Sequence, residues 1–209
     1  RVPLVAYWPG HIEAGVRTDA MVSWVDILPT LIDMAGGKSP DDIDGKSFAP
    51  VLLGKTKTHR GKIFTTHTGD KEMNIFPIRS VRIGKYKYIH NLRPDAYHTN
   101  HSDRLRTDGR GLYWDSWDEA AKTDPKAAAI IKRYHVRPEF EFFDLNKDPL
   151  ELENLADHPE YKGKLARLRA ELKAWTTMQG DELLPHRDPY LTSSPIPKLY
   201  RTPKKKRSK

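Results

Sequence analysis

Cysteine is absent from the 209 residues of this sequence. The absence excludes disulfide bonds, thiolate metal ligands and a cysteine nucleophile from the chain. It fits a bacterial protein of any compartment, so it does not decide where the protein is located.

Long apolar runs are absent as well. No run approaches the ~20 residues that a membrane-spanning helix needs, so we expect no membrane span. No signal peptide or initiator methionine is visible, because Arg1 leads directly into the apolar residues 2–8, which are typical of a buried strand. Since no turn precedes that strand, we expect the chain to begin in the middle of a domain, and a missing signal peptide then says nothing about the parent protein.

Acidic residues are too few to balance the basic ones, and the formal net charge is +8. Seven positive charges lie in the Pro-containing end of the chain: Lys198, Arg201, Lys204, Lys205, Lys206, Arg207 and Lys209. The body is close to neutral without this basic tail. We predict a solvated, disordered extension, with contact to nucleic acid, nuclear import and contact with a polyanionic glycan as alternatives. The body shows no basic stripe with stacking aromatics, which argues against a specific nucleic-acid-binding domain.

The first third of the chain carries a helix signal. Apolar residues recur at helical spacing from Val25 to Ala35, and Gly36-Gly37 follows as a stop. Ser23 and Asp26 fit a capping box, but a helix capped at Ser23 would hold Pro29 in its interior. If Asp26 is the cap, Pro29 falls in the first turn, where its missing N–H is harmless. Either start buries the same apolar face.

Polar and charged segments separate this region from the next. The pair Asp41-Asp42 opens a predicted turn that runs to Gly45, residues 47–53 read as a short helix, and 55–61 form a hydrophilic linker. We place a boundary there, which gives three regions: 1–60, 61–183, and an extended basic tail over 184–209.

Strand signals dominate the middle region. Residues 62–67 are β-prone, and 78–83 and 86–92 flank Gly84-Lys85 as a β-hairpin. A polar, His-rich loop over 93–111 is long enough to suggest a function. Helices over 118–122 and 125–134, a strand over 140–145 and an amphipathic helix over 160–178 follow. These signals predict a small antiparallel sheet packed on a long C-terminal helix.

Several motifs occur in an order and spacing that together resemble the sulfatase family. They are Arg1-Val2-Pro3-Leu4, Trp8-Pro9-Gly10, the helix opening Asp26-Ile27-Leu28-Pro29-Thr30-Leu31, and the turn Asp44-Gly45-Lys46-Ser47. Further stretches resemble the heparan N-sulfatase-like (N-sulfoglucosamine sulfohydrolase-like) branch: 76–82, 86–92, 141–149 and 153–156. The resemblance covers about residues 1–180 and leaves the tail unmatched.

The resemblance implies a fold and a place in it. Residues 1–60 would be the C-terminal end of an alkaline-phosphatase-like α/β catalytic domain, and 61–183 the α+β C-terminal subdomain of a sulfatase. Sulfatases of this family use formylglycine and calcium, and such a parent protein would be exported, periplasmic or extracellular. The N-terminal catalytic portion of the same protein would then be a partner, together with a sulfated glycan.

The residues that perform the family's chemistry are missing from this sequence. There is no Cys, and neither Ser39-Pro40 nor Ser194-Pro195 fits the formylglycine motif. Hydrolysis of a sulfate ester or sulfamate needs an activated nucleophile and concentrated positive charge for the sulfate oxygens. We therefore expect no catalytic residue, metal ligand or cofactor in this chain, with calcium and formylglycine in the intact parent.

One constellation is a candidate for substrate binding: His67, Asp70, Asn74 and Arg79, with Arg82 nearby. Gly69 permits a sharp turn after the strand that His67 closes. Asp70 and Asn74 offer hydrogen bonds to sugar hydroxyls, and Arg79 suits a sulfate or carboxylate. The alternative is that His67 and Asp70 brace a loop while Arg79 forms a structural ion pair.

Two further groups have a structural alternative that we favour over a functional one. His98, His101 and Asp103, with His90 nearby, invite a metal site, but we expect a hydrated loop or a lip over the substrate cleft. Trp114 and Trp117 could stack on a sugar ring, but packing of a helix on the sheet explains them without a function. The remaining rival for the whole chain is a stand-alone module that binds anionic polysaccharide through Arg79, Arg82 and the tail.

Overall fold

The computed structural model describes residues 2–69, 73–104, 111–182 and 188–194. The chain consists of two compact units, Arg1–Ile63 with Arg82–Gly84, and Phe64–Val81 with Lys85–Lys209. We refer to them as unit 1 and unit 2. The basic residues of the tail and Asp70 lie outside the described residues.

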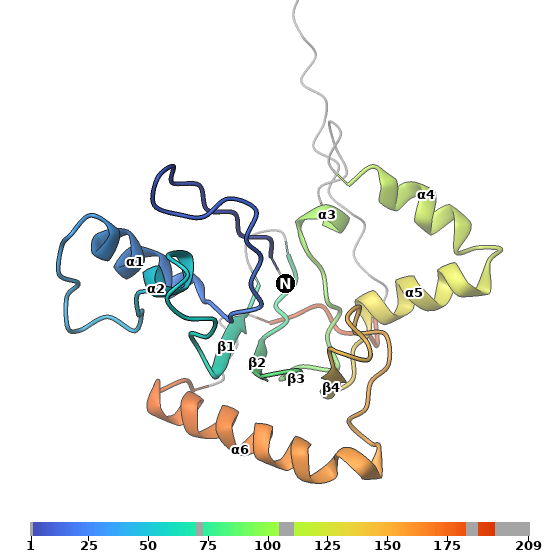
Figure 1. Ribbon diagram of the computed structural model, residues 1–209. Helices are drawn as coiled ribbons and strands as arrows, with labels where there is room; N and C mark the ends of the chain where they lie inside the picture. The colour runs from blue at the N-terminus through green and yellow to red at the C-terminus, as the bar shows by residue number, and fades with distance from the viewer. Residues whose placement is uncertain (1, 70–72, 105–110, 183–187, 195–209) are drawn as a thin grey trace, which may run out of the picture. The chain divides into compact units, whose positions relative to one another are not determined.

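Unit 1 holds three short helices: η1 (Trp24–Asp26), α1 (Ile27–Met34) and α2 (Ala49–Leu52) (Figure 1). Each of the two predicted N-caps begins a helical segment. Ser23 is the N-cap of the 3₁₀ turn η1, Asp26 is the N-cap of α1, and Pro29 therefore lies in the first turn of α1. The prediction of a strand over 2–8 is wrong for this structure, because no described segment pairs with those residues.

The apolar face of α1, which we expect the rest of the catalytic domain to cover, is exposed in this chain. Leu28 is 57% exposed and Leu31 59%, whereas the polar Asp26 and Thr30 are buried. The physical reason is that Asp26, Pro29 and Thr30 pack toward the turn over 44–48, so the Leu28–Leu31 side points away from the rest of unit 1.

The main sheet has four strands in sequence order, β1 (Lys62–His67), β2 (Ile78–Ile83), β3 (Tyr86–Asn91) and β4 (Phe140–Asp144). The predicted hairpin is confirmed, with Gly84 at positive φ in the connection between β2 and β3. β4 pairs antiparallel with β3, so that Tyr88 lies opposite Phe142.

Alternation along the strands gives the sheet two different faces. Tyr86, Tyr88 and their partners in β4 face the long helix α6 (Lys162–Met178), which follows the 3₁₀ turn η2 (Pro159–Tyr161). Leu165, Leu168 and Leu172 of α6 are buried, as the apolar spacing predicts. On the opposite face Ile89 and Phe143 pack with Leu145 and Ile78.

Three more helices occupy the segment between β3 and β4: α3 (His101–Arg104), α4 (Tyr113–Ala120) and α5 (Pro125–His135). Asp124 caps α5, because its Oδ1 accepts a hydrogen bond from Lys126 N at 2.8 Å. Trp114 is buried and packs against Tyr134 of α5, while Trp117 is 46% exposed. Across the described residues, no helix has the length and apolarity to cross a membrane.

Candidate substrate-binding site

The motifs of the first third of the chain meet around one buried carboxylate, Asp26. Its oxygens accept hydrogen bonds from Ser23 N and Lys46 N, both at 2.9 Å, and the Arg60 guanidinium binds both oxygens. Burial alone would raise the pKa of Asp26 and is the largest single effect. The bonds from Arg60, Lys46 and Ser23 together outweigh it and lower the pKa to about 2. Asp26 is therefore a permanent anion that joins three segments of unit 1.

Thr30 and Gly45 complete this junction. Thr30 Oγ1 donates to Asp26 O at 2.6 Å and accepts from Phe48 N at 2.9 Å. A Cβ on Gly45 would lie 1.9 Å from the carbonyl oxygen of Val25, so no other residue fits there without moving the backbone. The helix opening at Asp26–Thr30 and the Asp-Gly-Lys-Ser turn thus pack against each other. The separate pair Asp41-Asp42 lies in a turn, as predicted.

In unit 2, His67 ends β1 and is exposed. The next turn needs a glycine, since Gly69 has φ +124° and a Cβ there would lie 2.4 Å from Asn74 O. Phe76 N donates to Thr68 O at 2.8 Å and closes the loop across its base. Partial desolvation, and secondly the charge of Arg79, lower the pKa of His67 below 6.5, so its imidazole is neutral at pH 7.

Asn74 is buried and anchors the same loop. Its Nδ2 donates to Tyr97 O at 2.7 Å and Tyr190 O at 2.9 Å, and its Oδ1 accepts from Tyr190 N at 2.7 Å. Its backbone N–H donates to Thr99 Oγ1. An asparagine amide has four hydrogen-bonding positions, so three are used within the protein. Contact between Asn74 and a substrate stays a prediction.

Arg79 on β2 is 7% exposed, and its guanidinium contacts the backbone of His67. Its Nε and Nη2 bind the two carboxylate oxygens of Asp181, and its Nη1 donates to His67 O at 3.2 Å and Ile78 O at 3.0 Å. Of its five N–H groups, one has no acceptor within the described part of the chain. The structure therefore joins Arg79 to the strand end that carries His67, and a contact with sulfate stays a prediction.

His98 and His135 are hydrogen-bonded to each other, and the His98 ring contacts Phe76. His98 N donates to His135 O at 2.7 Å, and His135 Nδ1 lies 2.9 Å from His98 O. The His98 ring packs edge-on against Phe76, and burial, followed by the charges of Arg137 and His67, lowers its pKa to about 3. His98 is thus a neutral packing residue at physiological pH.

The metal-site alternative gains no support from these positions. His101 is exposed on α3, His98 Nδ1 contacts Tyr134 O, and the buried Asp103 accepts from Asn100 N and lies 3.8 Å from His135 Nδ1. Within the described ranges, no three His, Cys, Asp or Glu side chains gather closely enough to hold a metal ion.

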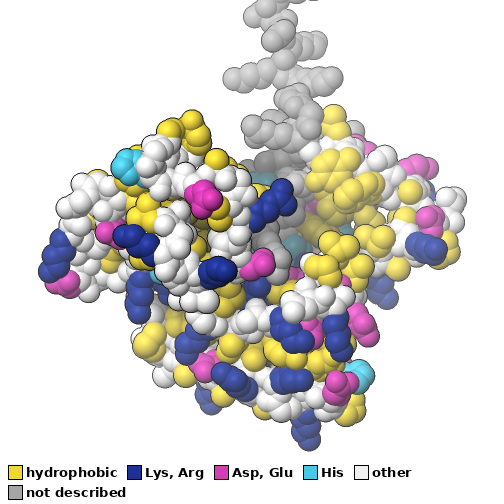
Figure 2. Space-filling model, viewed as in Figure 1, with side chains coloured by type: hydrophobic (Ala, Val, Ile, Leu, Met, Phe, Trp, Pro, Cys, Tyr) yellow, Lys and Arg dark blue, Asp and Glu magenta, His cyan; other side chains and the backbone are white. Residues whose placement is uncertain are grey.

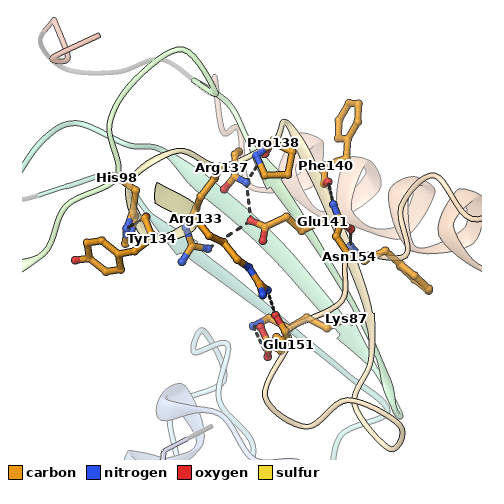
Figure 3. Close-up of polar contacts among 12 residues, drawn as sticks. Lys87, His98, Arg133, Tyr134, Arg137, Pro138, Phe140, Glu141, Glu151 and Asn154 are labelled. Carbon is orange, nitrogen blue, oxygen red and sulfur yellow. Dashed lines mark hydrogen bonds and ion pairs between the residues drawn. The ribbon is translucent and has the colours of Figure 1, made fainter. Parts of the chain in front are cut away.

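Charged residues on the sheet face that carries Lys87 and Glu141 are bound to one another (Figure 3). Glu141 accepts from Arg137 Nη1 at 3.4 Å, and Lys87 Nζ lies 2.8 Å from Glu151. Arg133 of α5 donates to the backbone oxygen of Glu151. These side chains fasten α5 and the 150s loop to the sheet, so they are not a separate substrate site.

Sequence reasoning singled out His67, Asn74 and Arg79, which the structure places around the end of β1, but it missed the residues that hold them. Asp181 is 102 positions from Arg79, and Tyr190 is 116 positions from Asn74. Asp181 follows directly on the end of α6, and no local pattern marks it. The resulting site is an exposed imidazole at a strand end, backed by a buried ion pair and an anchored loop.

Comparison with known proteins shows which family the chain resembles. Residues 1–104 match the family described as N-sulphoglucosamine sulphohydrolase, C-terminal. The chain is 32% identical over 186 residues to an ulvan-active sulfatase of Formosa agariphila, covering 88% of this chain and 34% of that protein. It is also 32% identical over 200 residues to human arylsulfatase A, covering 91% of this chain and 34% of that protein. The chain belongs to the sulfatase family.

A solved structure supports the same fold for this chain. The structure of BT4656 in complex with its substrate D-glucosamine-2-N,6-O-disulfate aligns with a TM-score of 0.56 and 23% identity, over 84% of this chain and 28% of that chain. The chain spans about a third of the length of the curated relatives it matches. The small antiparallel sheet with its long helix is the C-terminal subdomain of the family.

Proposed function

We propose that this chain is the C-terminal part of a sulfatase that hydrolyses sulfate esters or sulfamates on a glycan, with a heparan-type glucosamine as the substrate class. The chain would complete the fold and shape the substrate cleft, and it would be inactive alone. The observation that carries the proposal is the match to sulfatases along most of this chain but only a third of their length.

The exposed apolar residues of unit 1 support a partner portion of the same protein. They are Val2, Leu4, Val5, Tyr7, Val16, Trp24, Val25, Leu28 and Leu31. Large apolar patches on soluble proteins usually mark a contact surface. The proposed occupant is the N-terminal catalytic portion, whose α/β core would cover these side chains. If so, the isolated chain should self-associate, and a monodisperse monomer in sedimentation would argue against this surface.

The chemistry of sulfate cleavage would lie in that N-terminal portion. Formylglycine would supply the nucleophile and calcium the charge that binds sulfate oxygens, and the described residues of this chain offer no cluster that could hold the metal. What this chain contributes is binding and orientation of the sugar.

His67, Asp70, Asn74 and Arg79 are proposed to form one wall of the cleft. The neutral His67 imidazole can donate or accept a hydrogen bond to a sugar hydroxyl, because its pKa is lowered. Asn74 is held by Tyr97 and Tyr190, and Arg79 holds the end of β1 through His67 O. One Arg79 N–H has no acceptor among the described residues and could bind an anionic group. Preorganisation of this kind reduces the entropy that substrate binding must overcome.

The decisive experiment compares the full-length protein with the isolated chain. We expect sulfate release from a sulfated glucosamine by the full-length protein with calcium, and none above background by the isolated chain. Activity of the isolated chain that a substitution within it abolishes would overturn the proposal. Tight binding of a sulfated polysaccharide by the isolated chain, with no activity in the full-length protein, would favour a stand-alone binding module.

A further inference from the structure

The outer surface of α6 is strongly basic. The helix carries five exposed cationic side chains, Lys162, Lys164, Arg167, Arg169 and Lys173, against one acid, Glu171. Figure 2 shows Lys and Arg side chains gathered over the part of the molecule where α6 lies. We refer to these five side chains, with Lys147, as the α6 basic surface.

Two of these amines lie over the same aromatic ring. Lys164 Nζ is 5.2 Å from the centre of the Tyr161 ring and 5.2 Å from that of Tyr86, and Lys147 Nζ is 5.9 Å from that of Tyr161. Lys147 Nζ also donates to the Tyr161 hydroxyl at 3.2 Å. The rings hold both amines at fixed positions, since a cation is attracted to the face of an aromatic ring.

The acids beside this pair do not neutralise the whole surface. Asp144 is bound to Lys85 at 2.8 Å, and Glu160 is the acid close to Lys147. Among the described residues, neither Lys147 nor Lys164 forms an ion pair with a carboxylate. Like charges gathered on one surface repel one another, and a bound polyanion removes that repulsion.

We propose that the α6 basic surface is a second binding site, for the chain of a sulfated polysaccharide. It lies on the helix side of the sheet, whereas the substrate-binding proposal concerns the end of β1. Exposed ammonium and guanidinium groups along one helix match sulfate groups that repeat along a polymer. The inference rests on the proposed function. A glycan sulfatase that binds the polymer at a site away from its cleft keeps the cleft close to many sulfate groups of the same polymer.

The test uses the full-length protein and two variants with the same loss of charge. The first carries Lys147→Gln, Lys164→Gln and Arg167→Gln. The control carries Lys122→Gln, Lys126→Gln and Lys132→Gln, three exposed lysines of the α4–α5 region. Each is titrated with heparin at about 0.1 M salt, with double-stranded DNA as a second probe, and melting temperatures confirm folding.

We expect the α6 variant to bind heparin about tenfold more weakly and the control to stay within about twofold, because only the α6 variant loses charges that lie on the proposed surface. A single Lys164→Arg variant, which keeps the charge, should bind like the wild type. Equal losses in the two triple variants would overturn the proposal, and so would DNA binding as tight as heparin binding. Hydrolysis of a sulfated monosaccharide, measured in parallel, reports on the proposed function independently and should be unchanged in both variants.

Discussion

Arg79 and Asp181, which lie 102 positions apart in the sequence, form a two-point ion pair that joins β2 to the segment following α6. The same guanidinium donates to the carbonyl oxygen of His67 at the end of β1. One arginine therefore fixes the distance between a strand end, its neighbour and the end of the long helix.

Replacing Arg79 tests whether this pair is only structural. Arg79→Ala and Asp181→Ala should each lower the free energy of unfolding by roughly 3 kcal/mol, since each breaks a largely desolvated two-point ion pair. If Arg79 also contacts the substrate, Arg79→Ala should cost a further 1.5–3 kcal/mol or so in kcat/KM of the folded protein, the range for a charged hydrogen bond. Equal kcat/KM values for the two variants, measured below their melting temperatures, would make Arg79 a structural residue.

Asp26→Asn should destabilise the protein by roughly 3 kcal/mol, because it removes the carboxylate charge that binds Arg60 and replaces one of the two oxygens that accept backbone N–H groups by an NH₂ group. The effect is measured by urea unfolding at pH 7. Asp41→Asn, in an exposed turn, is the matched control and should change the free energy of unfolding by less than about 0.5 kcal/mol.

The same carboxylate predicts a pH dependence. The pKa of Asp26 is about 2 in the folded protein against 3.8 for an ordinary Asp. A lowered folded-state pKa stabilises the protein above pH 3.8 by about 2 kcal/mol, and this contribution is lost as the pH falls toward 2. The gap in unfolding free energy between wild type and Asp26→Asn should therefore shrink below pH 4. A gap that stays constant down to pH 2 would contradict the assigned pKa.

Gly45→Ala should be far more harmful than a glycine replacement elsewhere in unit 1. A Cβ at Gly45 would overlap the carbonyl oxygen of Val25, whereas a Cβ at Gly61 meets no atom within 4 Å. We expect a loss of at least about 2 kcal/mol for Gly45→Ala, as for other backbone overlaps, and a change near zero for Gly61→Ala. Equal melting temperatures for the two variants would show that the turn and the helix are not in contact.

The sequence predicts the elements of unit 2 well because its signals are local. The apolar spacing in α6 predicts which of its side chains are buried, and the Gly84-Lys85 turn sets the hairpin. Unit 1 was less predictable. Residues 2–8 have strand composition, but a strand also needs a hydrogen-bonded neighbour, which the described chain does not provide.

The candidate site shows the same limit. His67 and Gly69 follow from a strand end and a turn, and both lie where the sequence indicates. The buried state of Asn74 and Arg79 does not follow, because it depends on Tyr190 and Asp181, more than a hundred positions away. The motifs around Asp26 were recognisable, yet their structural role emerged from the hydrogen bonds to Ser23, Lys46 and Arg60.

The most direct test of the proposed cleft is the kcat/KM of the full-length protein on a sulfated glucosamine after His67→Ala. His67 is exposed, so the melting temperature should stay the same, and the loss of a neutral hydrogen bond should lower kcat/KM about fivefold. His158→Ala, at an exposed histidine near α6, is the control and should leave kcat/KM unchanged. Equal kcat/KM values for wild type and His67→Ala would contradict the claim that this chain shapes the substrate cleft at the end of β1.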